Sequence, residues 1–424
     1  MPKHSKDFLL KESKYFCMAP WTHMHSWPNG RTFACCQVQP EDHEKDLDYG
    51  NTNENSIYEL WNSKTIKELR LNMLNERPSN SCKRCYEIEN DAESSSLRKK
   101  LNDDMASYFY QIDETKEDGG HGTPKMAYFD LRFSNLCNMM CRTCSPVFSS
   151  MWYDDFVKAY GEVPKNVVPK KFLNLSEKKD FMKQLWPLMD DVKECYWAGG
   201  EPLITTEHWD IMNYWVEHNH SKTINVEYNT NFLNLKYKGQ SVFDLWNKFE
   251  NVEVMASLDG SYKRGEYIRK GTNWETIVNN RKEMIKHTPR THFKIGPTVT
   301  MMNIWHLPDF HREWIEQGLI KRPKDVHWNI LTGPEWFNIQ VLPTEFKKEV
   351  DNKWRKHLCW INKNSKPNNY HSSAIKGVLT YMNSADKSHL LPTSIEKLDF
   401  IDKVRNETWQ ETFPELSWLV DYKN

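Results

Sequence analysis

Hydrophobic positions form short strand-like runs along the chain, each followed by a polar or glycine-rich segment and then by a helix-like pattern. Six such runs occur: Met126–Phe133, Glu194–Trp197, Thr223–Tyr228, Val252–Ala256, His292–Gly296 and Val326–Leu331. Between them, apolar residues recur at helical spacing in Glu207–His218, Val242–Phe249, Trp274–Lys286 and Leu307–Gln317. Strands that alternate with helices predict parallel βαβ units. We therefore expect an α/β fold built on an open, partial (β/α)6 TIM-like barrel.

Polar motifs stand where the predicted strands end. The first strand leads into Cys137–Cys144, the second into Gly199–Pro202, the third into Asn229–Asn231 and the fourth into Ser257–Gly260. In barrels of this kind the chemistry collects at the carboxyl ends of the strands. The pattern therefore predicts one functional face for these motifs.

The rest of the chain divides around the barrel, which we assign to residues 125–342. Residues 1–112 carry a second group of cysteines, and 113–124 form a polar linker that includes Asp113–His121. Residues 343–424 are rich in lysine and then in aromatic residues, which predicts helices that close the barrel.

Charge and hydropathy exclude several classes of protein. Lys and Arg number 57 against 58 Asp and Glu, and no basic cluster exceeds a few residues, which argues against a nucleic-acid-binding or membrane-surface protein. The mean hydropathy of −0.79 and the absence of an 18-residue apolar run argue against a transmembrane helix. The opening residues lack the apolar core of a secretory signal, so we expect a cytoplasmic protein.

The cysteines indicate metal rather than disulfides, because most of the ten are clustered in a chain without a secretory signal. Cys137, Cys141 and Cys144 have the spacing C-x3-C-x2-C. Three thiolates ligate three irons of a [4Fe–4S] cluster and leave the fourth iron open to a small molecule. A zinc knuckle, or cysteines buried as small apolar residues, is the alternative.

This loop and the motifs after it resemble the radical S-adenosylmethionine enzymes. The resemblance implies that S-adenosylmethionine chelates the open iron of a site-differentiated cluster. It implies that Gly199, Gly200, Glu201 and Pro202 form the GGEP motif that holds the methionyl amino group of the cofactor. It further implies cofactor contacts by Asn231, Ser257, Asp259 and Arg269. One position departs from many members, since Thr143 stands where they carry an aromatic residue.

A second constellation lies in the N-terminal third of the chain. Cys17, Cys35, Cys82 and Cys85 supply four thiolates, a complete shell for a [4Fe–4S] cluster or a structural zinc ion. The run resembles the twitch/SPASM auxiliary-cluster module, with a G-x4-C turn from Gly30, a Gly-Asn pair at 50–51, Leu-Trp-Asn at 60–62 and a closing C-x2-C. That spacing favours Cys35 over Cys36 as the ligand.

Four further residues complete the expectations from the sequence. Cys195 and Cys359 are isolated, and we expect both in the core. His23 and His25 lie beside Cys17 and could face the cavity between the clusters, although a lone histidine is more often a satisfied polar group.

The resemblance implies a radical mechanism. An external donor of the flavodoxin or ferredoxin type reduces the cluster, the cofactor is cleaved to methionine and a 5′-deoxyadenosyl radical, and the radical abstracts a substrate hydrogen. Relatives with an auxiliary cluster favour a peptide or protein side chain that is oxidised or cross-linked. Oxidation of a sugar or nucleoside is an alternative, and a non-catalytic zinc-binding adaptor is an alternative of another class.

Overall fold

The structure is a computed structural model that describes residues 4–38, 47, 49–90, 96–163, 167–175, 177, 179–365 and 369–422. Its chain forms two compact units. Unit 1 comprises residues 1–136, 172–227 and 248–251, and unit 2 comprises residues 137–171, 228–247 and 252–424. Each unit is described by itself.

The helices of unit 1 are α1 (Ala19–Thr22), α2 (Ile57–Trp61), α3 (Lys64–Leu74), α4 (Lys83–Glu89), α5 (Leu97–Asp104), α7 (Lys179–Leu185) and α8 (Thr206–Glu217). Its strands are β1 (His23–Ser26), β2 (Arg31–Phe33), β3 (Gly50–Asn51), β4 (Tyr128–Leu131) and β6 (Glu194–Trp197). The boundary between the units passes through β7 (Asn225–Thr230) and near the start of β10 (Asn251–Ala256).

The helices of unit 2 are α6 (Met151–Tyr160), α9 (Val242–Trp246), α10 (Tyr262–Ile268), α11 (Trp274–His287), α12 (Leu307–Glu316), α13 (Thr344–Asn364), α14 (Asn369–Asn383), α15 (Leu391–Arg405) and α16 (Trp409–Thr412). Its short strands are β5 (Met140–Cys141), β8 (Lys236–Tyr237), β9 (Gln240–Ser241), β11 (Arg269–Lys270), β12 (His292–Ile295), β13 (Thr298–Val299) and β14 (Asn329–Ile330).

The main sheet has eight strands in the order β12-β10-β7-β6-β4-β1-β2-β3. The pairs β1/β4, β4/β6 and β10/β12 are parallel, whereas β1/β2 and β2/β3 are antiparallel. Helices intervene between the parallel strands, as the alternating pattern predicted. The α/β class is thus confirmed, with an open and mostly parallel sheet.

Five of the six predicted barrel strands appear in this sheet, as β4, β6, β7, β10 and β12. The sixth run, Val326–Leu331, also contains a strand, β14, but this strand lies outside the eight-stranded sheet. Val326 makes an isolated parallel bridge with Ile295, and β14 pairs with β13 in a separate two-stranded sheet. Pro297 separates these two pairings, and proline has no backbone N–H to continue a ladder.

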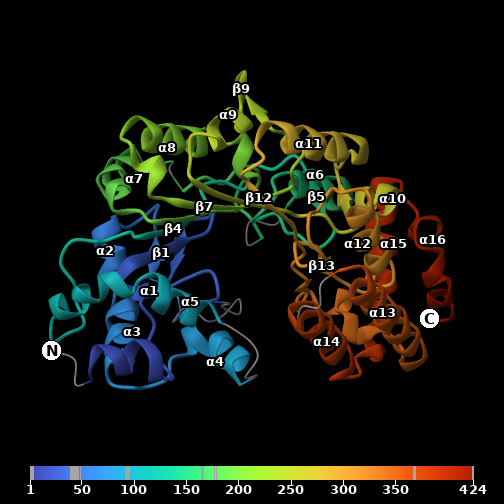
Figure 1. Ribbon diagram of the computed structural model, residues 1–424, viewed down its shortest axis with the longest axis horizontal. Helices are drawn as coiled ribbons and strands as arrows, with labels where there is room; N and C mark the ends of the chain where they lie inside the picture. The colour runs from blue at the N-terminus through green and yellow to red at the C-terminus, as the bar shows by residue number, and fades with distance from the viewer. Residues whose placement is uncertain are drawn as a thin grey trace. The chain divides into compact units, whose positions relative to one another are not determined.

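Strand β1 takes a place in the sheet that the sequence did not predict. It pairs in parallel with β4, in the register His23↔Tyr128 and His25↔Asp130 (Figure 1). In β6, β7, β10 and β12 a buried residue alternates with a partly exposed one, whereas every residue of β1 and β4 is buried. Both faces of β1 and β4 are therefore covered, including the face that carries their polar side chains.

The C-terminal part of the chain is helical, as the sequence predicted, and α13 to α16 gather together in unit 2 (Figure 1). Helix α13 buries Val350, Trp354, His357 and Ile361 along one face. Cys359 is exposed, so its predicted place in the core was wrong. Two residues along a helix turn by about 200°, which directs Cys359 away from the face that holds His357.

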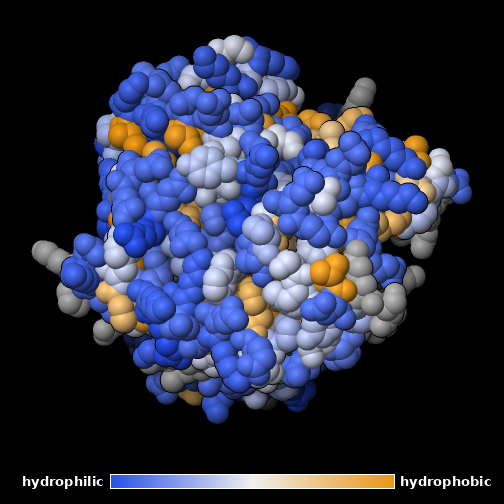
Figure 2. Space-filling model, turned by 90° about the vertical axis from the view of Figure 1, so that its right-hand side faces the viewer, coloured by the Kyte–Doolittle hydropathy of each residue, from blue (hydrophilic) through white to orange (hydrophobic). Residues whose placement is uncertain are grey.

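Figure 2 shows a mostly hydrophilic face on which hydrophobic residues form small, separate groups. Within the described ranges, no helix combines the length and the apolar character that crossing a bilayer requires.

Candidate functional site

Four cysteines of unit 1 line one small cavity. Cys17 comes from the turn before α1, Cys35 from the segment after β2, and Cys82 and Cys85 from the start of α4. Apolar side chains such as Met73, Leu97 and Leu101 complete the wall. The structure therefore brings together the four thiols that the sequence grouped, although they come from three separate segments of the chain.

The turn before β2 explains the glycine of the G-x4-C motif. Gly30 has a φ of +87°, and a Cβ at this position would lie 2.2 Å from Oδ1 of Asn51. Asn51 in turn donates from Nδ2 to the carbonyl oxygen of Asn29 at 3.1 Å. The close approach of β3 to this turn therefore requires glycine, and it fixes the hairpin that leads to Cys35.

The thiols in the cavity are strongly desolvated. Burial raises the pKa of Cys82 to about 12, and burial followed by repulsion from Cys82 raises the pKa of Cys17 well above its usual value. Arg98 lies on the wall of the cavity, and its Nη1 donates to the carbonyl oxygens of Ser13 and Phe16 at 3.0 and 2.7 Å. A fixed guanidinium suits the negative charge that four thiolates would carry.

Two further cysteines lie outside this group. Cys36 is not on the wall of the four-thiol cavity, and burial together with the nearby Asp130 carboxylate raises its pKa to about 12. Cys195 on β6 is buried, as the sequence predicted. The geometry thus places Cys35 with the other three thiols and Cys36 beside the sheet.

The C-x3-C-x2-C loop of unit 2 is held by backbone pairing. Its strand β5 pairs antiparallel with β11, in the register Arg269↔Cys141 and Lys270↔Met140. The N–H of Cys144 donates to the carbonyl oxygen of Cys141 at 3.0 Å, and Nε1 of Trp152 donates to the same oxygen at 2.9 Å. Cys137 donates its N–H to Oγ of Ser150 at 3.4 Å. The three cysteines therefore stand on a loop fixed by hydrogen bonds.

Arg269 lies directly against this loop. Its Nη1 donates to Sγ of Cys141 at 3.6 Å, and its Nε forms an ion pair of 2.8 Å with Oδ2 of Asp259. The other carboxylate oxygen of Asp259 accepts from the N–H of Thr298 at 2.7 Å. Arg269 and Asp259, which the sequence analysis proposed separately as cofactor contacts, thus form an ion pair, and Arg269 also donates a hydrogen bond to Cys141.

Other predicted positions have distinct surroundings. Nδ2 of Asn231 donates to Oδ1 of Asn138, inside the cysteine loop, at 2.6 Å. Ser257 donates its N–H to the carbonyl oxygen of Thr230 at 2.8 Å. Gly271, which the sequence reasoning did not single out, has a φ of +105°, and a Cβ there would lie 2.6 Å from the carbonyl oxygen of Asn138. The sequence offered one signal for a role of Gly271 at this site, namely its position two residues after the proposed cofactor contact Arg269.

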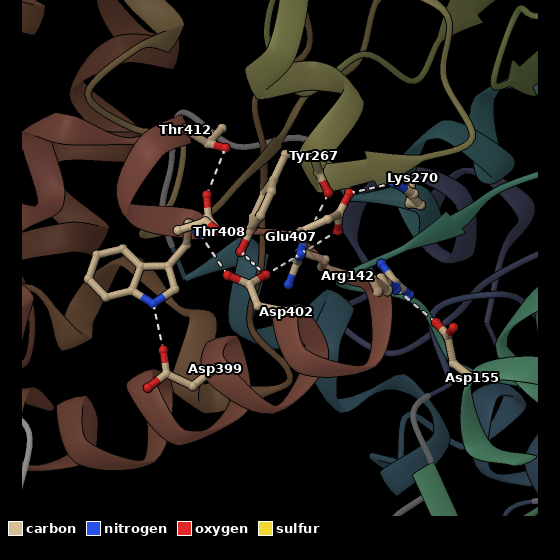
Figure 3. A network of polar contacts seen from close by, with 11 residues as sticks. Arg142, Asp155, Tyr267, Lys270, Asp399, Asp402, Glu407, Thr408 and Thr412 are labelled. Carbon is tan, nitrogen blue, oxygen red and sulfur yellow. Dashed lines mark hydrogen bonds and ion pairs between the residues drawn. The ribbon is translucent and has the colours of Figure 1, made fainter. Parts of the chain in front are cut away.

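A buried ion-pair network, also missed from the sequence, ties the cysteine loop to the C-terminal helices (Figure 3). Nη2 of Arg142 contacts Oδ1 of Asp402 at 2.5 Å and Oε2 of Glu407 at 2.7 Å, and its guanidinium lies 3.5 Å from the ring centre of Tyr267. Lys270, from the strand that pairs with the loop, binds the other oxygen of Glu407 at 2.7 Å. Asp402 of α15 and Glu407, in the connection between α15 and α16, therefore bind residues at both strands of the cysteine-bearing pair.

In unit 1, the GGEP segment forms a tight turn after β6. A Cβ on Gly200 would lie 2.2 Å from the carbonyl oxygen of Leu136, so this position requires glycine. Glu201 is buried; its N–H donates to that same oxygen at 2.8 Å, and its carboxylate accepts from the N–H of Leu203 at 3.2 Å. Pro202 begins the short helical turn that follows. The turn thus fixes the carboxylate beside the backbone that leads into Cys137.

The donor sets fit iron–sulfur chemistry. One group offers four thiols in a single cavity, and the other offers three thiols on an ordered loop with a guanidinium hydrogen-bonded to one sulfur. Thiolates are the usual cluster ligands, and hydrogen bonds to the sulfurs tune the cluster. The residues present therefore suit a complete and a three-cysteine [4Fe–4S] site.

One segment of the chain matches a known protein family. Residues 17–86 match the SPASM family, an iron-sulfur cluster-binding domain. The predicted SPASM-type module is thus confirmed over the segment that holds Cys17, Cys35, Cys82 and Cys85. A search of curated protein sequences found no match.

Several solved structures are distantly similar to this chain. "Native anSMEcpe with bound AdoMet and Cp18Cys peptide" is 16% identical with a TM-score of 0.34, over 56% of this chain and 61% of that one. "Native anSMEcpe with bound AdoMet" is 18% identical with a TM-score of 0.33, over 55% and 60%. "Structure of TYW1 with a lysine-pyruvate adduct bound" is 15% identical with a TM-score of 0.27, over 57% and 72%. The chain spans about three fifths of the anSMEcpe chains, and similarity this low carries no argument about function.

Proposed function

We propose that this protein is a radical S-adenosylmethionine enzyme that oxidises or cross-links a peptide or protein side chain. The observation that carries the proposal is the division of seven cysteines into two groups. Four line one cavity inside an iron-sulfur cluster-binding domain, and three stand on one hydrogen-bonded loop. Three thiolates leave one iron of a cube open, which a simple electron-transfer protein does not need.

The chain's own residues divide the task in this proposal. Cys137, Cys141 and Cys144 ligate the site-differentiated cluster. Glu201, fixed by the GGEP turn, pairs with the amino group of the cofactor. Bound there, S-adenosylmethionine and the reduced cluster supply a carbon-centred radical that can remove hydrogen from an unactivated carbon.

Further polar residues contribute to the cofactor site in this proposal. Asn231 and Ser257 offer hydrogen bonds, and the Arg269–Asp259 pair fixes the charge beside Cys141. The absence of a paired-carboxylate or Ser–His motif from the sequence fits this division, because the cofactor supplies the reactivity. In this proposal residues 1–112 form the auxiliary-cluster domain and 113–124 a linker. Residues 125–342 form the partial barrel, and 343–424 form the helices that close it.

The auxiliary site has a separate role. With four thiolates available, the cluster held by Cys17, Cys35, Cys82 and Cys85 has no open iron for a substrate. When filled, this site would supply an acceptor for the second electron of a two-electron oxidation, after hydrogen abstraction has removed the first. An external flavodoxin- or ferredoxin-type donor is needed to reduce the first cluster.

The choice of a peptide substrate is supported by a cavity in unit 2. This cavity has a volume of about 280 Å³ and one edge at Cys144. Its walls include the aromatic side chains of Trp152, Phe156, Tyr160, Trp336 and Phe400. Aromatic walls bind through apolar area and stacking, which suits the side chain of a peptide better than a phosphate or a compact ionic metabolite.

The radical chemistry is tested by cofactor cleavage. The anaerobically reconstituted chain should release 5′-deoxyadenosine from S-adenosylmethionine in the presence of dithionite, measured by liquid chromatography and mass spectrometry. The variant C137A/C141A/C144A should lose this activity, while C359A, an exposed cysteine outside both groups, should keep it. Cleavage that persists in the triple variant contradicts the proposal.

The substrate class needs its own experiment. Incubation with candidate peptides encoded near the gene should give a loss of about two mass units per turnover, one hydrogen pair. Deuterium transfer into 5′-deoxyadenosine from a labelled sugar or nucleoside, with no change in any peptide, would replace the peptide by the small-molecule alternative.

A further inference from the structure

Three buried side chains of unit 1 converge away from the thiol groups. His23 and His25 stand on β1, two positions apart and hence on one face of the strand, and Asp130 stands opposite His25 on β4. One ligand atom from each residue lies within 4.8 Å of the ligand atoms of the other two. All three residues are fully buried, and none lines the four-thiol cavity.

Hydrogen bonds fix the tautomer of both imidazoles. Nδ1 of His23 lies 2.9 Å from the carbonyl oxygen of Tyr128, and Nδ1 of His25 lies 3.0 Å from that of Asp130. A carbonyl oxygen only accepts, so both Nδ1 atoms carry the proton and both Nε2 atoms present a lone pair. Metal-ligating histidines have this arrangement, with the second nitrogen donating to a backbone carbonyl or a carboxylate.

The lone pairs are unmatched among the described residues. Nε2 of His23 and Nε2 of His25 have no hydrogen-bond partner there, and Oδ2 of Asp130 lies 3.1 Å from Nδ1 of His25. A buried acceptor without a partner costs free energy, so two such nitrogens beside a buried carboxylate call for a ligand with positive charge.

The charged surroundings are compatible with a cation. Oδ1 of Asp130 faces Nε of Arg132 at 3.4 Å, which leaves Oδ2 on the side of the histidines. Among the described residues, the other ionisable groups near Asp130 are Cys36, Tyr128, Cys195 and Tyr196, and none of these carries a positive charge. Asp130 therefore balances one cation already and has a second oxygen to offer.

We propose that His23, His25 and Asp130 form a mononuclear site for a divalent transition metal ion, Zn²⁺ or Fe²⁺. Two imidazoles and one carboxylate are a recurrent ligand set for both ions, and three protein ligands leave coordination positions open for an oxygen or nitrogen donor of a small ligand. None of the three residues lines the four-thiol cavity, and the site does not depend on the radical chemistry proposed above.

The test uses the full chain with both cluster sites filled by anaerobic reconstitution, treated with a chelator and then equilibrated with micromolar Co²⁺. We expect one cobalt per chain, with ligand-field absorption and no thiolate-to-cobalt charge transfer. The variant H23Q/H25Q should lose this cobalt. The control H208Q removes another fully buried histidine of unit 1, on α8, and should keep it.

X-ray absorption of the wild-type cobalt form keeps the test valid if the double variant does not fold. A nitrogen and oxygen shell with imidazole scattering supports the site. Absence of bound cobalt, sulfur in the shell, or cobalt retained by folded H23Q/H25Q overturns it. Zinc content and the Mössbauer signal of mononuclear Fe²⁺ in the isolated protein decide between the two ions.

Discussion

Arg142, between two cysteines of the C-x3-C-x2-C loop, contacts the carboxylate of Asp402 at 2.5 Å across 260 positions of the chain. Both side chains are buried, and the same carboxylate accepts a hydrogen bond from Oη of Tyr267 and another from the N–H of Trp409. The loop that carries three cysteines thus depends on α15 for one of the two carboxylates that pair with its buried arginine.

Removing that partner should destabilise the protein and its loop together. Breaking a buried ion pair from one side costs about 3–5 kcal/mol, and Glu407 still faces Arg142, so we expect about 3 kcal/mol for D402A. Denaturant unfolding measures the loss, and iron analysis should show depletion of the three-cysteine site. The control E396Q changes an exposed carboxylate of the same helix and should leave both unchanged. Equal stability of D402A and wild type would contradict the structural role.

The two groups of cysteines predict the iron content. Two cubes imply about eight irons per chain after anaerobic reconstitution, and C82A/C85A should reduce this to about four. C35A should disrupt the auxiliary cluster, whereas C36A should preserve it, because Cys36 lies beside Asp130. Iron and sulfide analysis gives the result; stoichiometric zinc in the N-terminal site would refute the auxiliary cluster.

Glu201 should matter for cofactor affinity more than for folding. Charge-assisted hydrogen bonds contribute about 1.5–3 kcal/mol, so E201Q should weaken S-adenosylmethionine binding roughly ten- to a hundredfold. Anaerobic equilibrium dialysis measures this affinity. E217Q, at the exposed end of α8, is the matched control. Unchanged affinity in E201Q would remove this carboxylate from the cofactor site.

The GGEP turn makes a steric prediction. A methyl group at Gly200 would meet a backbone oxygen at 2.2 Å, so G200A should shift the turn and cost about 1–3 kcal/mol of stability. G122A places its methyl group where no atom lies within 4 Å and should change the unfolding free energy little. Thermal unfolding of the two variants compares them directly, and similar midpoints would show that the turn yields without cost.

Buried histidines should make the protein sensitive to acid. Burial lowers the pKa of His208 to about 3 and those of His306 and His357 to about 4, from about 6.5 in an unfolded chain. Between the folded and the unfolded pKa values, the unfolded chain binds more protons than the folded one. The stability that comes from keeping these histidines neutral is therefore present above about pH 6.5 and is lost as the pH falls toward 4. Unfolding midpoints between pH 7 and 4 should fall, and less steeply in H208Q. A flat profile would contradict the neutral buried state.

The sequence predicted much of the fold because local pattern and tertiary structure agree there. Helices α8, α9, α11 and α12 begin within one residue of their predicted starts, and five strands fall where apolar runs were read. Strand β1 was not predicted because its buried positions hold the polar residues His23 and His25, and a polar segment of this kind reads as exposed chain. Val326–Leu331 does contain a strand, but Pro297 interrupts the ladder that would join it to the main sheet, and the apolar run carries no signal of that interruption.

The candidate site divides in the same way. Cysteine spacing and the GGEP segment are local signals, so the thiol groups and the tight turn could be read from the sequence. The Arg142–Asp402 contact and the His23–His25–Asp130 group could not, because each joins segments that come together only in the folded sheet and helices. The spacing of His23 and His25 was a partial signal, which placed both on one face once β1 was known to be a strand.

The contact between Arg142 and Asp402 also orders events during synthesis. A ribosome adds about 5–20 residues per second, so the 260 residues that separate the two take roughly 13–52 seconds to follow. Throughout that interval the three-cysteine loop has been synthesised, but it lacks the Asp402 carboxylate that contacts its arginine. A cluster inserted into the final form of this loop would therefore be inserted only after translation has passed residue 402.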